Sequence, residues 1–210
     1  PFKQYVLQAL NLYSRLDIKT IAPLHGPILR TNPHYYLKKY EEWSSEDKFR
    51  KNTFGKKMLS VFYMSSYDNT HKMAEVIMEG ADTVEGIVAS MYDLASLDEK
   101  NMIDLLEESD AIIVGSPTIN GDAVKPAWDL LSCMAFLESQ GKVGAAFGSY
   151  GWTGEAPEML HDRMRWLKFR LPVKPIKVKL IPTEDELDEC FAFGKEVAEI
   201  TMGKMVEMEI

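Results

Sequence analysis

The stretch Lys57-Met-Leu-Ser-Val-Phe-Tyr-Met-Ser-Ser-Tyr-Asp-Asn-Thr70 decides the fold. Its first half, residues 58–63, is a short apolar run of aromatic and β-branched side chains, typical of a strand buried on both faces of a parallel sheet. Its second half, residues 65–70, changes to hydroxyl and amide side chains. A helical pattern follows, because apolar residues at 73, 77, 81 and 84 recur at spacings of three or four. A strand, a polar loop and a helix in this order are typical of a phosphate site.

The polar loop has the chemistry that a phosphate needs. The first turn of a helix presents unpaired backbone N–H groups and the positive end of its dipole, so a phosphate is stabilised there without lysine or arginine. The loop lacks the Gly-Lys-Ser/Thr ending of a Walker A motif and the Gly-x-Gly-x-x-Gly of a dinucleotide turn. Hydroxyl-rich composition instead indicates a terminal monoester phosphate. The alternative is that these side chains only cap the next helix.

The strand-then-helix pattern repeats from Lys57 to about Gly203 and predicts an α/β fold, an open doubly wound parallel sheet of five strands. Strands are expected at residues 58–63, 87–92, 111–115, 143–147 and 173–181. The last should lie at an edge, because proline cannot donate to a ladder and lysines deter edge pairing. Thr183 and Glu186 predict a capping box for the final helix, whose inward face is expected to include Phe191 and Gly194.

The first 56 residues read as a separate, short segment. Helices are expected at 2–15 and from Pro33 through Trp43, with a short apolar strand at 18–24 between them. The polar, charged residues 44–56 are interpreted as a linker. His25, before Gly26-Pro27, is either an ordinary turn residue or a metal ligand held by a rigid turn.

Composition narrows the class of protein. A net charge of −8 and a pI near 5.1 disfavour nucleic-acid and anionic-membrane partners. Cys133 and Cys190 have no metal-binding spacing, and no signal peptide or transmembrane run is visible, so a reducing, cytoplasmic location is expected. Cys133 falls beside an apolar helical stripe and is expected to pack. The chain begins at Pro1, through initiator removal or as a piece of something longer.

Three polar loops, residues 65–70, 116–122 and 149–155, follow the carboxyl ends of predicted strands. Ligands of open α/β sheets bind at this edge, so the loops should converge on one site. Side chains at 118–120, 150 and 152 could sandwich a flat heteroaromatic ring and hydrogen-bond its edge. A phosphate together with a planar ring indicates a mononucleotide. The alternative is that Tyr150 and Trp152 merely cover the end of the sheet.

These residues also carry a family resemblance. The region from Lys57 to about Gly203 resembles a flavodoxin domain, which implies the strand order 2-1-3-4-5. The loop Ser65-Ser-Tyr-Asp-Asn-Thr70 resembles the FMN phosphate motif Ser/Thr-x-Tyr/Thr-Gly-Asn-Thr. Asp68 stands where that motif has glycine, and aspartate is among the few residues that tolerate a positive φ.

The preceding segment is similar to the end of the metallo-β-lactamase-like domain of flavodiiron proteins, in which a His-Gly-Pro turn supplies an iron ligand and a Tyr-x-x-Trp helix leads to the flavodoxin domain. Here these are His25-Gly26-Pro27 and Tyr40–Trp43, and Ser149-Tyr-Gly-Trp152 resembles that family's flavin loop. The family's His-x-Glu-x-Asp-His cluster is absent from the sequence. The resemblance therefore divides the chain into a remnant of that domain (1–43), a linker (44–56) and a flavodoxin-like FMN domain (57–210).

The resemblance implies that FMN takes electrons from rubredoxin or from a flavin or NAD(P)H reductase and passes them to a diiron site that reduces dioxygen or nitric oxide. His25 would be a metal ligand only in the complete protein. The other iron ligands would come from a missing diiron domain or from a homodimer partner. The chain alone would be an electron-transfer domain. The implied cofactor contacts are Ser65, Ser66, Tyr67, Asp68, Asn69 and Thr70 for the phosphate, and Pro117, Thr118, Ile119, Asn120, Ser149, Tyr150, Gly151, Trp152 and Gly154 for the ring.

Two other classes of function remain open at this point. One is a freestanding flavodoxin-like NAD(P)H:quinone reductase, and the other is a non-redox interaction module with a vestigial pocket. A visible absorption spectrum would separate the last from the other two, because bound flavin is coloured.

Overall fold

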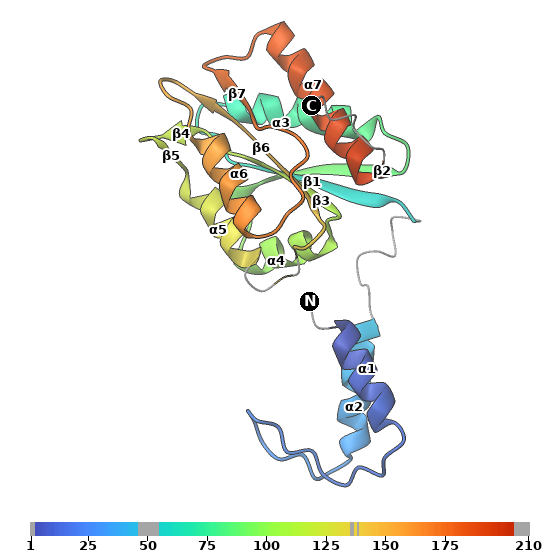
Figure 1. Cartoon of the computed structure of the whole chain (residues 1–210). Helices are drawn as coiled ribbons and strands as arrows, with labels where there is room; N and C mark the ends of the chain where they lie inside the picture. Colours follow the sequence, from blue (N-terminus) through green and yellow to red (C-terminus); the bar gives the residue numbers. More distant parts are fainter. Residues whose placement is uncertain (1–2, 46–54, 135–136, 138, 204–210) are drawn as a thin grey trace. The chain divides into compact units, whose positions relative to one another are not determined.

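The computed structural model describes residues 3–45, 55–134, 137 and 139–203. The chain divides into two compact units, residues 1–52 and residues 53–210, and each is described by itself (Figure 1). The expected linker at 44–56 includes residues 46–54, which lie outside the described part. None of the helices in that part combines the length and the apolar character that crossing a membrane requires.

The first unit contains two helices, α1 (Lys3–Tyr13) and α2 (Pro33–Ser45), which pack side by side (Figure 1). Pro33 opens α2, as predicted. The strand expected at residues 18–24 is wrong, because this segment makes only one antiparallel bridge, between Ile21 and Leu29. The apolar side chains here find little to pack against within the unit, and Leu24 is 99% exposed. An apolar run without a neighbouring strand cannot continue a ladder beyond a single bridge.

The second unit is a parallel sheet between two layers of helices. Its sheet strands are β1 (Lys57–Tyr63), β2 (Ile87–Asp93), β3 (Ala111–Gly115), β6 (Val143–Tyr150) and β7 (Ile176–Lys179). Its helices are α3 (Asn69–Asp82), η2 (Leu94–Ser96), α4 (Glu99–Glu108), α5 (Lys125–Cys133), α6 (Ala156–Trp166) and α7 (Glu184–Thr201). The strand order β2-β1-β3-β6-β7, with every pair parallel, confirms the predicted doubly wound topology and the order 2-1-3-4-5.

The two faces of the sheet bury two separate clusters of side chains. Val61 and Ile113 face α3 and α7, whereas Phe62 and Ile112 face α4, α5 and α6. Figure 1 shows α3 and α7 together on one side of the sheet and the other three helices on the opposite side. Alternate residues of β1 thus serve both layers, which is why this strand reads as a continuous apolar run.

The capping box at the start of α7 is confirmed, because Thr183 Oγ1 accepts the Glu186 N–H at 3.3 Å and the Glu186 carboxylate accepts the Thr183 N–H at 2.9 Å. The expectation that Phe191 points inward is wrong. Phe191 is 36% exposed, and Phe193 is buried instead. Phe193 shares a stripe with Cys190 and Val197 at spacings of three and four residues, and Phe191 falls outside that stripe.

The edge strand and its neighbour differ from the expected lengths. β7 lies at the edge of the sheet as predicted, but it spans only Ile176–Lys179 and starts after Pro175, which has no N–H to donate. β6 continues three residues beyond the expected end at Phe147, because Phe147–Tyr150 pair with β7. The longer β6 carries Ser149 and Tyr150 to the same edge of the sheet as the ends of β1 and β3.

Candidate ligand pocket at the strand ends

The loop between β1 and α3 leaves the start of that helix uncapped by a side chain. Asp68, the residue before α3, has φ 67° and ψ −7°, the left-handed conformation that aspartate tolerates better than most residues. Its carboxylate makes no capping hydrogen bond to a backbone N–H in the first turn of α3. The alternative that the loop merely caps the helix is therefore wrong for Asp68, and the first-turn N–H groups keep their capacity to bind an anion.

Ser65, in the same loop, carries an orphaned hydroxyl. Its Oγ is buried and has no hydrogen-bond partner within the described structure. Leaving a buried hydroxyl unpaired costs about 1–3 kcal/mol, so such groups normally have a partner. This hydroxyl is the kind of donor that a phosphate oxygen would satisfy.

Thr70 reaches across to another strand. Its Oγ1 lies 2.8 Å from Oγ of Ser149, and both residues are buried. The hydrogen bond joins the start of α3 to the end of β6, so it fixes the first and third predicted loops relative to each other. Thr70 therefore helps to hold the site together, and because either hydroxyl can donate in this bond, one of the two keeps a hydrogen for another acceptor.

The second loop contains a hairpin that the sequence analysis did not predict. Its strands are β4 (Thr118–Ile119) and β5 (Asp122–Ala123), and the turn between them places Asn120 and Gly121 at φ 54° and 73°. Two positive φ angles in a two-residue loop are the geometry that Asn-Gly favours. Buried Ser116 closes the base of the hairpin, because its Oγ donates to the Pro117 carbonyl at 2.8 Å and accepts the Val124 N–H at 3.0 Å.

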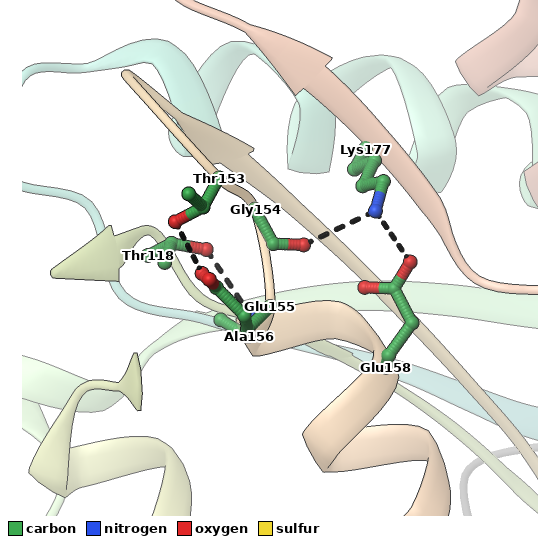
Figure 2. Close-up of polar contacts among 7 residues, drawn as sticks. All are labelled: Thr118, Thr153, Gly154, Glu155, Ala156, Glu158 and Lys177. Carbon is green, nitrogen blue, oxygen red and sulfur yellow. Dashed lines mark hydrogen bonds and ion pairs between the residues drawn. The ribbon is translucent and has the colours of Figure 1, made fainter. Parts of the chain in front are cut away.

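The third loop is braced from two sides, as Figure 2 shows. The Ala156 N–H donates to Thr118 Oγ1 at 3.2 Å, which ties the start of α6 to the hairpin. From β7, the Lys177 ammonium donates to the Glu158 carboxylate at 2.6 Å and to the Gly154 carbonyl at 3.3 Å. The hydrogen bond to Glu158 raises the pKa of Lys177.

Gly154 has a structural reason to be glycine. Its φ is 76°, and a Cβ there would come within 2.9 Å of the Tyr150 ring. The Tyr150 ring thus packs directly over the backbone of residue 154. Gly154 shapes the loop from below and does not itself line the pocket.

The three loops enclose one pocket of about 470 Å³, within the usual range for small-ligand sites. The predicted residues that line it are Ser66, Tyr67, Asn69, Pro117, Thr118, Ile119, Asn120, Ser149, Tyr150, Gly151 and Trp152. Four predicted residues lie outside the lining, namely Ser65, Asp68, Thr70 and Gly154. The remaining lining residues, Gly121, Thr153 and Leu180, were not predicted.

Two of the missed residues, Gly121 and Thr153, sit inside loops that were predicted to form the site. Leu180 was missed because the edge strand was expected to run through residue 181. Instead β7 ends at Lys179, and the Leu180 N–H donates to the Tyr150 carbonyl at 2.8 Å, which turns Leu180 into the pocket. The sequence signal that could have identified Leu180 is its position at the end of a strand, because the strand ends form the ligand-binding edge of the sheet.

The side chains that line the pocket are uncharged, and two of them are exposed aromatic rings. The lining residues include no lysine, arginine, histidine, aspartate or glutamate. Tyr67 and Trp152 are 87% and 93% exposed, although large aromatic rings are usually much more buried. A ligand anion in this pocket would depend on hydroxyls, amides and backbone N–H groups. A planar ring would find the largely exposed aromatic surface of Tyr67 and Trp152.

Neither cysteine belongs to this pocket. Cys133 is buried, and burial raises the pKa of its thiol, which agrees with the expected packing role. Cys190 is buried in α7, where burial raises the pKa of its thiol to about 12.

His25 lies exposed in the first unit, next to Gly26 with φ 113°. Within the described ranges, no three histidine, cysteine, aspartate or glutamate residues are grouped so that they could hold a metal ion. His25 as a metal ligand thus remains a prediction.

A 2-1-3-4-5 parallel sheet with a pocket at the reversal between β1 and β3 defines the flavodoxin-like class of α/β proteins. The flavodoxin family model matches residues 61–194, and the chain belongs to that family.

Longer proteins resemble the entire chain. It is 42% identical over 210 residues to type A flavoprotein fprA of Rhodobacter capsulatus, covering 100% of this chain and 48% of that protein. It is 33% identical to flavo-diiron protein FprA2 of Clostridium acetobutylicum, covering 94% of this chain and 49% of that protein. The structure of rubredoxin oxygen:oxidoreductase from Desulfovibrio gigas superposes with a TM-score of 0.73 at 26% identity, covering 97% and 50%. The chain thus spans about half the length of these relatives.

Proposed function

We propose that the pocket binds FMN and that the chain is the electron-transfer part of a flavodiiron oxidoreductase. The observation that carries this proposal is the uncapped start of α3, together with the buried, unpartnered Ser65 hydroxyl in the loop that leads to it. A dianionic phosphate would satisfy both features at once, and the uncharged lining leaves the helix start as its main electrostatic partner.

The residues divide into two groups by what they would contact. Those assigned to the phosphate are Ser65, Ser66, Tyr67, Asn69 and Thr70, with Asp68 setting the backbone between them. Those assigned to the ring are Pro117, Thr118, Ile119, Asn120, Ser149, Tyr150, Gly151 and Trp152, while Gly154 would act indirectly, through its packing against the Tyr150 ring. Leu180 adds apolar surface at the far side of the pocket.

Bound FMN would supply the redox chemistry, and the chain would supply its binding, orientation and electrostatic environment. Trp152 would shield the ring from water, because its side chain lines the pocket and is 93% exposed. The net charge of −8 would disfavour an additional negative charge on the reduced ring. We therefore expect the chain to lower the reduction potential of the cofactor.

The wider role follows from the longer relatives. We infer that electrons reach the FMN from rubredoxin or from a flavin or NAD(P)H reductase and continue to a diiron centre that reduces dioxygen or nitric oxide. Its remaining ligands would come from the part of the relatives outside the matched half or from a homodimer partner, with His25 contributing one ligand. A cytoplasmic location is consistent with the two free cysteines.

A freestanding quinone reductase fits less well, because the similarity to the R. capsulatus relative includes the first 56 residues and not the flavodoxin part alone. An interaction module with a vestigial pocket fits less well too, because the orphaned Ser65 hydroxyl and the two exposed rings still suit a ligand.

Replacing Ser65 by alanine tests the phosphate assignment. Loss of a hydrogen bond to a charged group should weaken FMN binding by about 1.5–3 kcal/mol, measured by quenching of FMN fluorescence. The unfolding free energy without flavin should not fall, because the hydroxyl has no partner to lose. Ser132→Ala is the matched control, because its exposed hydroxyl donates to the Trp128 carbonyl on α5 and Ser132 does not line the pocket. Equal FMN affinity for the two variants would contradict the assignment.

A further inference from the structure

Among the described residues of the second unit, two α-helices begin after an aspartate, and the two aspartates behave differently. Asp98, before α4, has an extended φ of −83°, and its carboxylate accepts the Asn101 N–H at 2.8 Å. This is the usual way in which aspartate caps a helix. Asp68, before α3, accepts the first helical bond through its carbonyl, from the Lys72 N–H at 3.0 Å, but its carboxylate does not cap. Asp68 therefore does not make the helix-capping hydrogen bond that Asp98 makes.

The carboxylate of Asp68 is instead held by His71. The two side chains meet with Nδ1 of His71 2.8 Å from Oδ1 of Asp68. A carboxylate can only accept, so Nδ1 of His71 carries the hydrogen and donates it. The other ring nitrogen lies 3.5 Å from the Glu75 carboxylate.

The His71 ring is fixed from below as well. It stacks on the Tyr63 ring at the end of β1, with centroids 5.1 Å apart and an angle of 13° between the planes. Tyr63 is itself only 8% exposed. The imidazole therefore has a defined position in which it bonds the Asp68 carboxylate, and that carboxylate makes no capping bond to a first-turn backbone N–H of α3.

We propose that His71 is a positioning residue that keeps Asp68 in its left-handed conformation and so reserves the first-turn N–H groups of α3 for a phosphate. Without this hydrogen bond, Asp68 would rotate to an extended φ, and its carboxylate would cap the helix as Asp98 does. The carboxylate would then occupy the phosphate position and repel the anion. The inference rests on the proposed function for the identity of the ligand, FMN.

Binding of FMN and of riboflavin, which lacks the phosphate, tests the proposal. His71→Ala should raise the Kd for FMN roughly tenfold, the size of a lost or gained helix cap, and change the Kd for riboflavin less than about twofold. Adding Asp68→Gly to His71→Ala should restore FMN affinity, because glycine adopts the left-handed conformation at no steric cost and has no carboxylate. His34→Ala, an exposed histidine of α2, serves as the control and should leave both affinities unchanged.

Three binding results would overturn the proposal: an unchanged FMN Kd in His71→Ala, an equal loss for FMN and riboflavin, or a double variant as weak as His71→Ala. An equal loss would indicate a general structural role.

A crystal structure of ligand-free His71→Ala decides the same question without any flavin. The expected result is a negative φ at Asp68 with its carboxylate bonded to a first-turn N–H of α3. A φ that stays near 67° without such a bond would overturn the inference. Failure of the unmodified chain to bind FMN would contradict the proposed function alone, and this structure would still test the role of His71.

Discussion

Among single residues, Trp152 offers the clearest separation of binding from stability. Its side chain is 93% exposed, so Trp152→Ala should change the unfolding free energy by no more than about 0.5 kcal/mol. The same change should weaken FMN binding and shift the midpoint potential, because the ring loses its aromatic neighbour. Urea unfolding without flavin and FMN titration measure the two effects.

Trp166 is the matched control, since it is 81% exposed on α6 and does not line the pocket. If Trp152→Ala and Trp166→Ala bound FMN equally well, Trp152 would be a surface residue without contact to the ring.

The left-handed conformation of Asp68 was indicated by the family motif, which has glycine at that position. Most of the pocket lining was predicted from this resemblance together with the residue types at the ends of predicted strands. The orphaned Ser65 hydroxyl could not, because the loss of a partner depends on how the loop is buried. The Thr70–Ser149 hydrogen bond joins residues 79 positions apart, and no local pattern encodes such a contact. The proposed role of His71 could not be predicted from the sequence either, because it depends on the stacking of its ring on Tyr63.

Between elements, α3 and α7 approach each other closely at Gly194. A Cβ on Gly194 would come within 1.9 Å of the Ile77 carbonyl oxygen, which is backbone and cannot move aside cheaply. Gly194→Ala should therefore lower the unfolding free energy by about 1–3 kcal/mol. The expected sign is opposite to helix propensity, which favours alanine over glycine by about 1 kcal/mol.

Chemical denaturation of Gly194→Ala beside Lys195→Ala, an exposed neighbour in the same helix, provides the measurement. A Gly194→Ala chain as stable as the unmodified one would show that the two helices can separate without cost.

The sheet strands and helices of the second unit follow from periodicity, because each element buries a face whose spacing is readable. Apart from the orientation of Phe191 in α7, the failures lie in short segments or at strand ends, where spacing carries little information. Strands β4 and β5 have two residues each, and the only sequence signal for their hairpin is the Asn120-Gly121 pair in the turn. The segment 18–24 has apolar residues but no strand partner beyond one bridge. The end of β7 was misplaced because the pairing with β6, and not composition, sets its length.

For the chain as a whole, the central question is what it can do without the rest of its longer relatives. The described residues contain no group of three side chains suited to a metal ion, and stable iron sites need several protein ligands with supporting contacts. We expect iron analysis of the purified chain to find much less than one atom per chain. Gas-reductase activity should appear only when the other half of such a protein is supplied.

Two tightly bound iron atoms per chain would contradict this expectation. Such a result would mean that residues outside the described part, or a second copy of the chain, supply the ligands.

The most direct test of the account is calorimetric titration of the purified chain with FMN and, separately, with riboflavin. The uncapped start of α3, the Ser65 hydroxyl and the uncharged pocket together predict one FMN per chain, bound at least tenfold more tightly than riboflavin, since even one hydrogen bond to a charged group contributes about 1.5–3 kcal/mol. Equal affinity for the two flavins, or no binding of FMN, would contradict the central claim that this loop holds a phosphate.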